Sequence, residues 1–375
     1  MRVVLTGISG LRKKDILGKI CLLCNEKERD NCDFDQDVSF DEKSFDSAYV
    51  DKTFDLEHEM CKREDFRVPN YLDISEDELL RAKNRTLNYI IEESEGNENV
   101  ILGMHSSYYR KNSLFSVIDW NKLREYKPNL FITLLDDIHS IKKRIQNNEN
   151  SGEVKYIPMK DLLWWREVEI LISQQISRNL NSTNIPHYIL AREQAITLLY
   201  QLMFEPTKKK AYASYPVTAA KKDPDIIKET SNFIKELKKR YIVFDPMTIG
   251  EKKLQNALIE NLKSPHPKPK INVTKKNGEE IECDVADVMP IISAINGQIV
   301  SRDERLVLQS DMVIGYRPTL SPGAQHELRY AKSTSRVETY IVHPLDDSTS
   351  PFVNELADEV FPSIEKLFER LDKNS

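Results

Sequence analysis

The sequence predicts an α/β protein with two three-layer domains, each containing a parallel β-sheet between layers of helices. The first reason is that short apolar runs typical of buried strands alternate with longer amphipathic runs typical of helices. The second is that this alternation stops at residues 205–210, where a proline and a run of lysines occur, and then begins again. The third is length, since 375 residues exceed what one apolar core usually supports. We therefore expect two domains, 1–206 and 207–375.

The first domain is expected to alternate strands and helices from its first residues. Ser75 and Glu78 form a capping box that marks the start of one helix. The acidic stretch 30–59 shows little periodicity, so we expect a long surface loop or an irregular insertion there. The expected strands are 3–5, 99–102, 129–135 and 188–190, and the expected helices are 12–26, 75–93, 137–146, 159–180 and 192–203.

The second domain is expected to repeat the pattern. A charged, proline-bearing stretch at 264–270 reads as a loop. The expected strands are 211–214, 241–244, 312–315 and 339–342, and the expected helices are 225–238, 289–308 in two pieces, 324–332 and 350–371.

Composition and charge limit the classes of function. Hydrophobic residues make up 40% and charged residues 30% of the chain, as in ordinary soluble enzymes. A formal net charge of -6 creates too weak a field to favour duplex nucleic acid or an anionic membrane as a partner. The apolar run at the N-terminus is too short for a signal peptide, and no later run suits a membrane span, so we expect a cytoplasmic protein.

The five cysteines are expected to be free thiols, because their number is odd and the chain shows no export signal. Together with His58, four of them offer an alternative as zinc ligands. However, Cys21 and Cys24 are three residues apart in an apolar helical stretch, where burial explains the spacing, and we expect no metal site. The cysteines are Cys21, Cys24, Cys32, Cys61 and Cys283.

A loop in the position of a phosphate-binding loop follows the first strand. Gly7, Gly10 and Lys13 lie where backbone N–H groups and a helix N-terminus attract phosphate. The glycine expected before the lysine is Arg12, and the Ser or Thr expected after it to hold magnesium is Lys14. Three cations at the positive end of a helix are unfavourable unless an anion binds, which supports a phosphate ligand over a solvated helix start.

The layout of 1–206 resembles the adenylate kinase-like group of P-loop nucleotide kinases. Lys13 matches the loop lysine, residues 103–106 match a histidine-containing or acidic site after the second strand, and 129–144 match a strand and a helix with a basic residue. The resemblance implies a P-loop kinase-like fold and makes the loop a candidate site for ATP or another nucleotide. The substitutions in the loop favour nucleotide binding or a structural role over phosphotransfer.

Glu327 is the main catalytic candidate of the second domain. It follows the strand 312–315 and lies in the first turn of the helix expected at 324–332, at the sheet edge where α/β proteins bind ligands. There the helix dipole lowers the pKa of a carboxyl group, so we expect Glu327 to be ionised at neutral pH, as a nucleophile must be. A role as a helix cap is the alternative.

The residues around Glu327 resemble the nucleoside 2-deoxyribosyltransferase family, above all the branch of N-glycosidases that act on nucleoside 5'-monophosphates. The likeness is carried by the order and spacing of 301–306, 311–314 and 321–331, within a region of about 165 residues. It implies a flavodoxin-like fold. The family's compact members need no stretch as long and charged as 251–297, which we expect to reshape or cover the base pocket.

The same resemblance implies roles for individual residues. Glu327 matches the nucleophile, Asp303 the second carboxylate, and Ser321 a serine that binds the 5'-phosphate, while Gly323 lies in the turn that delivers Glu327. Contacts to the substrate are also implied for residues at the end of the first strand and directly after the second, although the two tyrosines fit a core role equally well. These residues are Tyr212, Ser214, Tyr215 and Asp245.

The expected function is hydrolysis or transfer at the N-glycosidic bond of a (deoxy)nucleoside 5'-monophosphate, which requires no cofactor. In this mechanism Glu327 attacks C1' as the base departs, and Asp303 donates or steers a proton to the base. An NAD glycohydrolase, a bifunctional nucleotide kinase and a nucleotide sensor without catalysis remain as alternatives. Family members commonly assemble, so the resemblance also implies a homo-oligomer.

Overall fold

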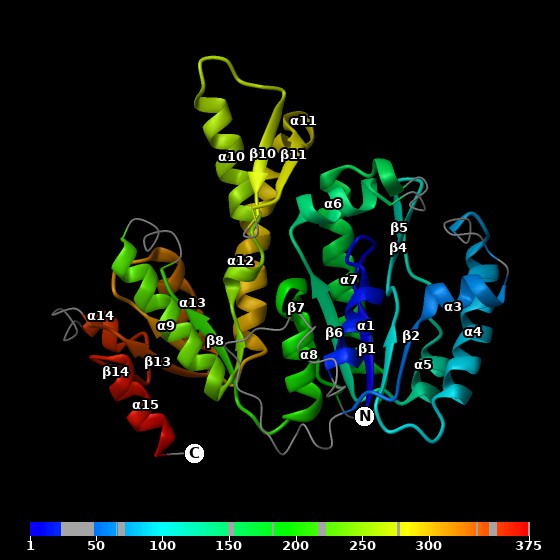
Figure 1. Ribbon diagram of the computed structural model, residues 1–375, viewed down its shortest axis with the longest axis horizontal. Helices are drawn as coiled ribbons and strands as arrows, with labels where there is room; N and C mark the ends of the chain where they lie inside the picture. The colour runs from blue at the N-terminus through cyan, green and yellow to red at the C-terminus, as the bar shows by residue number, and fades with distance from the viewer. Residues whose placement is uncertain are drawn as a thin grey trace. The chain divides into compact units, whose positions relative to one another are not determined.

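The computed structural model divides the chain into two compact units, each with its own sheet (Figure 1). Unit 1 comprises the described residues within 1–23, 49–199 and 249–296, and unit 2 those within 200–248 and 297–373. No helix among the described residues has the length and apolar character needed to cross a bilayer. The described residues are 1–23, 49–64, 66, 72–148, 154–181, 184–216, 223–275, 278–334, 337–344 and 351–373.

This division differs in two ways from the single boundary expected after residue 206. The units meet in sequence between Leu199 and Tyr200, and residues 249–296 belong to unit 1. Two ion pairs inside unit 1 show why: Glu251 pairs with Arg166, and Asp287 pairs with Lys142. The partners are 85 and 145 residues apart in sequence, so no local pattern announces them.

The sheet of unit 1 has five parallel strands in the order β2-β3-β1-β6-β7. Helices cover both faces, which explains why its strands are continuous apolar runs. The predicted parallel sheet is confirmed, with one strand added: β2 lies in the stretch where we expected an irregular loop. The strands are β1 Arg2–Thr6, β2 Lys52–Asp55, β3 Val100–Gly103, β6 Leu130–Leu135 and β7 His187–Ala191.

Helices pack on both faces of this sheet. On one face α4, α5 and α7 bury apolar side chains against Val4, Leu102 and Phe131, and on the other Leu17 of α1 lies against Gly103. Most of the acidic stretch, residues 30–48, lies outside the described residues. The helices are α1 Lys13–Leu23, α3 Leu56–Arg63, α4 Glu76–Glu93, α5 Trp120–Tyr126, α6 Ile138–Gln146, α7 Met159–Asn179, η4 Arg192–Gln194 and α8 Ala195–Phe204, and a small hairpin joins β4 Tyr108–Arg110 to β5 Ser113–Phe115.

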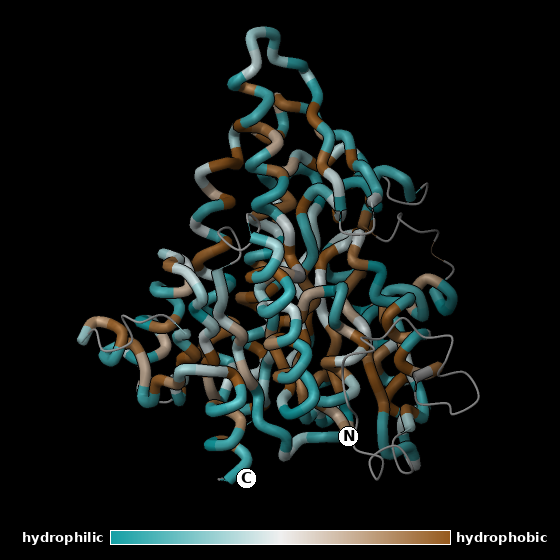
Figure 2. The backbone as a smooth tube through the Cα atoms, turned by 60° about the vertical axis from the view of Figure 1, so that its left-hand side comes forward, coloured by the Kyte–Doolittle hydropathy of each residue, from teal (hydrophilic) through white to brown (hydrophobic). Residues whose placement is uncertain are grey.

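Residues 249–296 form an antiparallel hairpin flanked by helices, which the sequence did not predict. Its strands alternate exposed and buried side chains, because only one face packs on a neighbour. The loop 264–269 is exposed and hydrophilic, at the top of Figure 2. The elements are α10 Glu251–Lys263, β10 Lys270–Thr274, β11 Glu280–Asp284, α11 Val285–Val288 and η7 Met289–Ile291.

The sheet of unit 2 also has five parallel strands, in the order β14-β13-β12-β8-β9. This is the flavodoxin-like order, with a switch point between the first strand, β8, and the third, β12, where such sheets bind ligands. The predicted flavodoxin-like fold is therefore confirmed. The strands are β8 Lys210–Ser214, β9 Ile242–Phe244, β12 Met312–Tyr316, β13 Glu338–Val342 and β14 Glu359–Phe361.

Helices α9 and α15 cover one face of this sheet with Phe233, Leu237 and Leu367, and Leu328 of α13 lies against Gly315 on the other. One prediction is wrong: the single closing helix expected at 350–371 is a short helix, the strand β14 and a second helix. The helices are α9 Pro224–Arg240, η6 Pro246–Thr248, α12 Ile292–Leu308, α13 Pro322–Ser333, α14 Pro351–Asn354 and α15 Ile364–Asp372.

Candidate functional site

Unit 2 brings its predicted residues together at the switch point of the sheet. Ser214 is the last residue of β8 and pairs in register with Gly315 of β12. The chain then leaves β12 and enters α13, which carries Glu327 back over the ends of these two strands. The Ser214 hydroxyl donates a hydrogen bond of 2.6 Å to Oε2 of Glu327. The structure thus brings Ser214 and Glu327 into direct contact, and their roles in a reaction stay a prediction.

Glu327 has a raised pKa, contrary to the prediction. Burial is the largest cause, the charge of Asp303 adds to it, and the hydrogen bond from Ser214 opposes both, so the pKa of Glu327 rises to about 8. A carboxyl group loses hydration on burial, which disfavours its charged form. In the free protein Glu327 therefore holds its proton over most of the neutral range.

The position of Glu327 along α13 explains the error. Ser321 is the N-cap and its hydroxyl accepts a hydrogen bond from the backbone N–H of Ala324, so the helix begins at Pro322 rather than at Ala324. Glu327 is thus the sixth helical residue, beyond the first turn, where the helix dipole has little effect. Ser321, meanwhile, serves as a cap, and a capping hydroxyl still has its own proton to donate.

Asp303 is paired with Arg302, a residue that the sequence did not single out. The guanidinium lies 2.9 Å from Oδ1 of Asp303 through Nε and 2.8 Å through Nη2. Arg302 is buried, and its Nη2 also lies 3.5 Å from the carbonyl oxygen of Pro246. This arrangement places a fixed positive charge beside the second carboxylate of the site.

Tyr212 within β8 and Tyr215 just after it lie close to the same carboxylates. Tyr212 is buried, and its pKa is raised well above the ordinary value by burial and then by the charges of Glu327 and Asp303. The Tyr215 hydroxyl donates a hydrogen bond of 2.6 Å to Asp245, while its ring belongs to the core. Burial agrees with the core role of both residues, and the role in substrate binding stays a prediction.

Gly323 and His326 face away from the crowded part of the site. A side chain at Gly323 would meet only the Ser321 hydroxyl, at 3.9 Å, so packing does not require glycine there. His326 is exposed and lies 3.0 Å from Glu304, as a surface residue should. Within the described part of the chain, no group of three or more His, Cys, Asp or Glu side chains has the arrangement of a metal site.

In unit 1 the predicted phosphate-binding loop has positive backbone φ angles at its two glycines. Gly7 and Gly10 have φ angles of +147° and +83°, which residues with side chains rarely adopt. A Cβ atom at Gly10 would also lie 2.9 Å from the carbonyl oxygen of Ile141. Nearby, the N–H of Gly7 is already bonded to the buried carboxylate of Glu169, at 2.9 Å.

Lys13 is directed back into the loop. Its Nζ donates to the carbonyl oxygen of Gly7 at 2.8 Å and lies 3.2 Å from Nε2 of His105. Burial, followed by the charges of Lys13 and Lys83, lowers the pKa of His105 well below its ordinary value, so this imidazole is neutral. His105 comes from the 103–106 segment that the sequence placed after the second strand.

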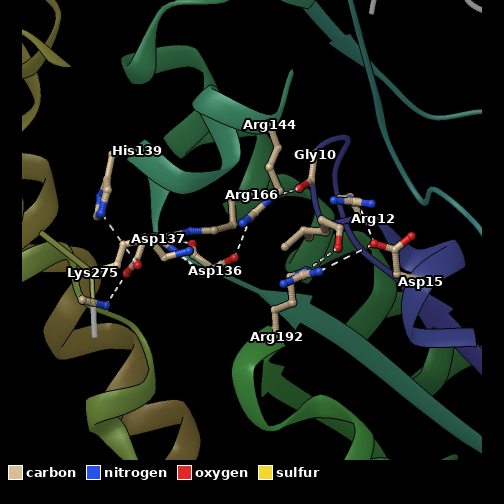
Figure 3. Close-up of polar contacts among 12 residues, drawn as sticks. Gly10, Arg12, Asp15, Asp136, Asp137, His139, Arg144, Arg166, Arg192 and Lys275 are labelled. Atoms are coloured by element: carbon tan, nitrogen blue, oxygen red, sulfur yellow. Dashed lines mark hydrogen bonds and ion pairs between the residues drawn. The ribbon is translucent and has the colours of Figure 1, made fainter. Parts of the chain in front are cut away.

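Two arginines hold the outer part of the loop (Figure 3). Arg144 of α6 donates to the carbonyl oxygen of Gly10 and pairs with Asp136, while Arg192 donates to the carbonyl oxygen of Leu11 at 2.9 Å. Behind them Asp137 accepts a hydrogen bond from the backbone N–H of Gly250, and burial raises its pKa. The loop is thus held by α6 and by the residue that follows β7, and Asp137 at the start of α6 contacts the 249–296 segment.

The loop opens into a cavity of about 880 Å³. Its walls carry seven cationic side chains against three carboxylates, a composition that favours anions. One of the carboxylates, Glu57, is buried, and its Oε2 has no hydrogen-bond partner among the described residues. The cations are Arg12, Lys13, Lys14, Lys143, Arg144, Arg192 and Lys275, and the carboxylates are Asp55, Glu57 and Glu279.

Comparisons with known proteins give likenesses to solved structures alone. No protein-family model matches the chain, and no curated protein matches its sequence. Among solved structures, the chain is similar to a shikimate kinase from Bacteroides thetaiotaomicron, with 13% identity and a TM-score of 0.33, over 55% of this chain and 98% of that chain. A likeness of that size carries no argument about activity. The resemblance of unit 2 to deoxyribosyltransferases stays a prediction.

Proposed function

We propose that unit 2 is an N-glycosidase that cleaves or exchanges the base of a (deoxy)nucleoside 5'-monophosphate, with Glu327 as its nucleophile. One observation carries the proposal: at the switch point of the sheet, Glu327 receives a hydrogen bond from Ser214 and lies near enough to Asp303 for that charge to raise its pKa. Most glycosidases cleave the glycosidic bond with a pair of carboxyl groups.

In the proposed reaction the ionised Glu327 attacks C1' of the sugar, and the C1'–N bond breaks with its electron pair leaving on the base. Asp303, fixed by Arg302, steers a proton to the departing base. Water or a second base then attacks C1' and releases Glu327. No cofactor takes part in these steps.

The 5'-phosphate is assigned to the start of α13. The Ser321 hydroxyl and the positive end of the α13 dipole suit an anion, and the open space over Gly323 leaves room for it. A phosphate held here lies away from the scissile bond and orients the sugar over Glu327.

The test is release of free base, measured by chromatography, from a panel of deoxynucleoside and ribonucleoside 5'-monophosphates, the matching nucleosides and NAD. The Glu327→Gln variant should lose on the order of 100-fold or more of the activity. Glu304→Gln is the matched control, because Glu304 is close in sequence to Asp303 but contacts the exposed His326. Release from NAD alone would favour a glycohydrolase of that cofactor, and an active Glu327→Gln would rule out the nucleophile.

A second function is proposed for unit 1: binding of ATP or another nucleotide through Lys13 and the N-terminus of α1. The cationic cavity beside the loop supports it. Lys14, at the position of a magnesium ligand, contacts His58 at 3.3 Å, which favours binding over phosphotransfer. Titration calorimetry with ATP, with Lys13→Gln as the variant, tests binding. Transfer of labelled phosphate from ATP to any acceptor of the panel would instead establish a kinase.

A further inference from the structure

The hairpin of the 249–296 segment contributes charged side chains to the cavity beside the phosphate-binding loop. Lys275 follows β10 and Glu279 precedes β11, so both flank the turn of the hairpin, and both line the cavity with Lys143 of α6. Glu279 lies 2.9 Å from Lys143 and 3.6 Å from Lys275. One carboxylate thus contacts two cations at a wall of the cavity that is separate in sequence from the loop.

The hairpin and the helix after it are fixed in this position by partly buried and exposed contacts. Asp287 pairs with Lys142 and accepts a hydrogen bond of 3.0 Å from the backbone N–H of Met159. Lys143 also donates to the carbonyl oxygen of Glu280, at 3.0 Å. These contacts tie the hairpin to α6 and α7, so Lys275 and Glu279 belong to the cavity wall.

We propose that Lys143 and Lys275 form a second anion subsite of this cavity, which Glu279 occupies until a ligand with several phosphates displaces it. The proposal rests on nucleotide binding by unit 1. The hydrogen bond from Lys143 lowers the pKa of Glu279, which keeps this internal competitor charged at neutral pH. All three side chains are partly exposed, so an exchange of Glu279 for phosphate oxygens needs no unfolding.

The ligand class follows from the cationic side chains and the size of the cavity. Lys13 and the start of α1 suit one phosphate group, and the Lys143–Lys275 pair suits another. A volume of about 880 Å³ is far more than a single phosphate fills. A nucleoside diphosphate or triphosphate can contact both subsites at once, whereas inorganic phosphate contacts only one.

The experiment is titration calorimetry of the full chain with tripolyphosphate, ATP and inorganic phosphate. Lys275→Gln and Lys143→Gln should each weaken the binding of tripolyphosphate and of ATP by about tenfold. The affinity for inorganic phosphate should stay within about twofold of that of the parent. Glu279→Gln should have the opposite effect and strengthen the binding of both polyphosphates by about fivefold, because the competing carboxylate is removed. Glu282→Gln is the matched control: Glu282 lies on β11, three residues after Glu279, but its partner is the exposed Lys270, at 2.6 Å.

Two results would separate this inference from the function on which it rests. If the parent binds ATP and Lys13→Gln abolishes binding, but Glu279→Gln behaves like Glu282→Gln, the second subsite is refuted and nucleotide binding stands. If the parent binds none of the three ligands, nucleotide binding itself fails. Thermal unfolding of each variant shows that the exposed substitutions leave the fold intact.

Discussion

The carboxyl group of Glu327 has a pKa of about 8, because it is buried and lies near the charge of Asp303. A nucleophile must be ionised, so base release should rise with pH and level off above about pH 8. The measurement is kcat/KM against pH from 5 to 10, which reports the free enzyme. Glu304→Gln should give the same profile. A rate that instead falls above pH 8 would assign Glu327 as the proton donor.

The hydrogen bond from Ser214 favours the charged form of Glu327, at a donor–acceptor distance of 2.6 Å. Ser214→Ala removes it, and we expect the midpoint of the pH profile to move upward by about one pH unit. At pH 7 the rate should therefore fall by about tenfold, while the plateau above pH 9 changes less. Equal losses at both pH values would mean that Ser214 acts on the substrate rather than on Glu327.

The raised pKa of Glu327 also makes stability depend on pH. Between the ordinary pKa of glutamate and about 8, the folded state holds more protons here than the unfolded state, so stability falls as pH rises. Glu327→Gln removes this loss, and should stabilise the protein by on the order of 2 kcal/mol at pH 9 and by much less at pH 5. Urea unfolding at the two pH values measures the difference. A stabilisation equal at both would contradict the raised pKa.

Glu327 was a candidate from the sequence because the carboxyl ends of neighbouring parallel strands share one edge of a sheet, where ligands bind. Asp303, Ser214 and Tyr212 became candidates only through the resemblance to deoxyribosyltransferases. Arg302 was not predictable, because no pattern shows that its guanidinium turns toward the adjacent residue. The pKa of Glu327 was missed for a related reason: it depends on burial, which the local sequence does not specify.

At the scale of elements, the residue at which α13 begins determines whether the helix dipole affects the pKa of Glu327. A serine followed by a proline is a frequent helix start, with serine as the N-cap and proline as the first helical residue. Placing the start two residues later put Glu327 in the first turn and gave the wrong sign to its pKa shift. Short strands were missed as well, since β2 and β14 carry charged residues at their ends and show too few apolar positions to signal a strand.

The two roles of Ser321, helix cap and phosphate ligand, are separable by substitution. Aspartate caps helices as well as serine does, but its charge repels phosphate. Ser321→Asp should therefore keep the thermal midpoint of the parent and raise KM for 5'-monophosphates by about tenfold or more, with nucleosides little affected. Ser321→Ala should instead cost about 1 kcal/mol of stability. If Ser321→Asp changes KM for nucleosides and monophosphates alike, the phosphate is bound elsewhere.

At the scale of the whole molecule, the assignment of 249–296 to unit 1 was beyond the sequence. The alternation of strands and helices predicts the boundary between the units near residue 206. The return of the chain to unit 1 at residues 249–296 depends on pairs such as Arg166 with Glu251. A buried ion pair is specified by two positions far apart, neither of which is unusual alone. Of the charged residues in this stretch, Lys275 and Glu279 line the cavity of unit 1.

Each unit has its own sheet and its own apolar core, so we expect two transitions in calorimetric unfolding. A ligand stabilises only the unit that binds it, and a ligand at 100 times its Kd adds about 2.7 kcal/mol. Tripolyphosphate should therefore raise the midpoint temperature of one transition by roughly 5 to 10 °C and leave that of the other unchanged. Lys13→Gln should abolish this increase. Glu327→Gln at pH 9 should move only the other transition. A single transition that responds to both changes would mean that the two units unfold as one.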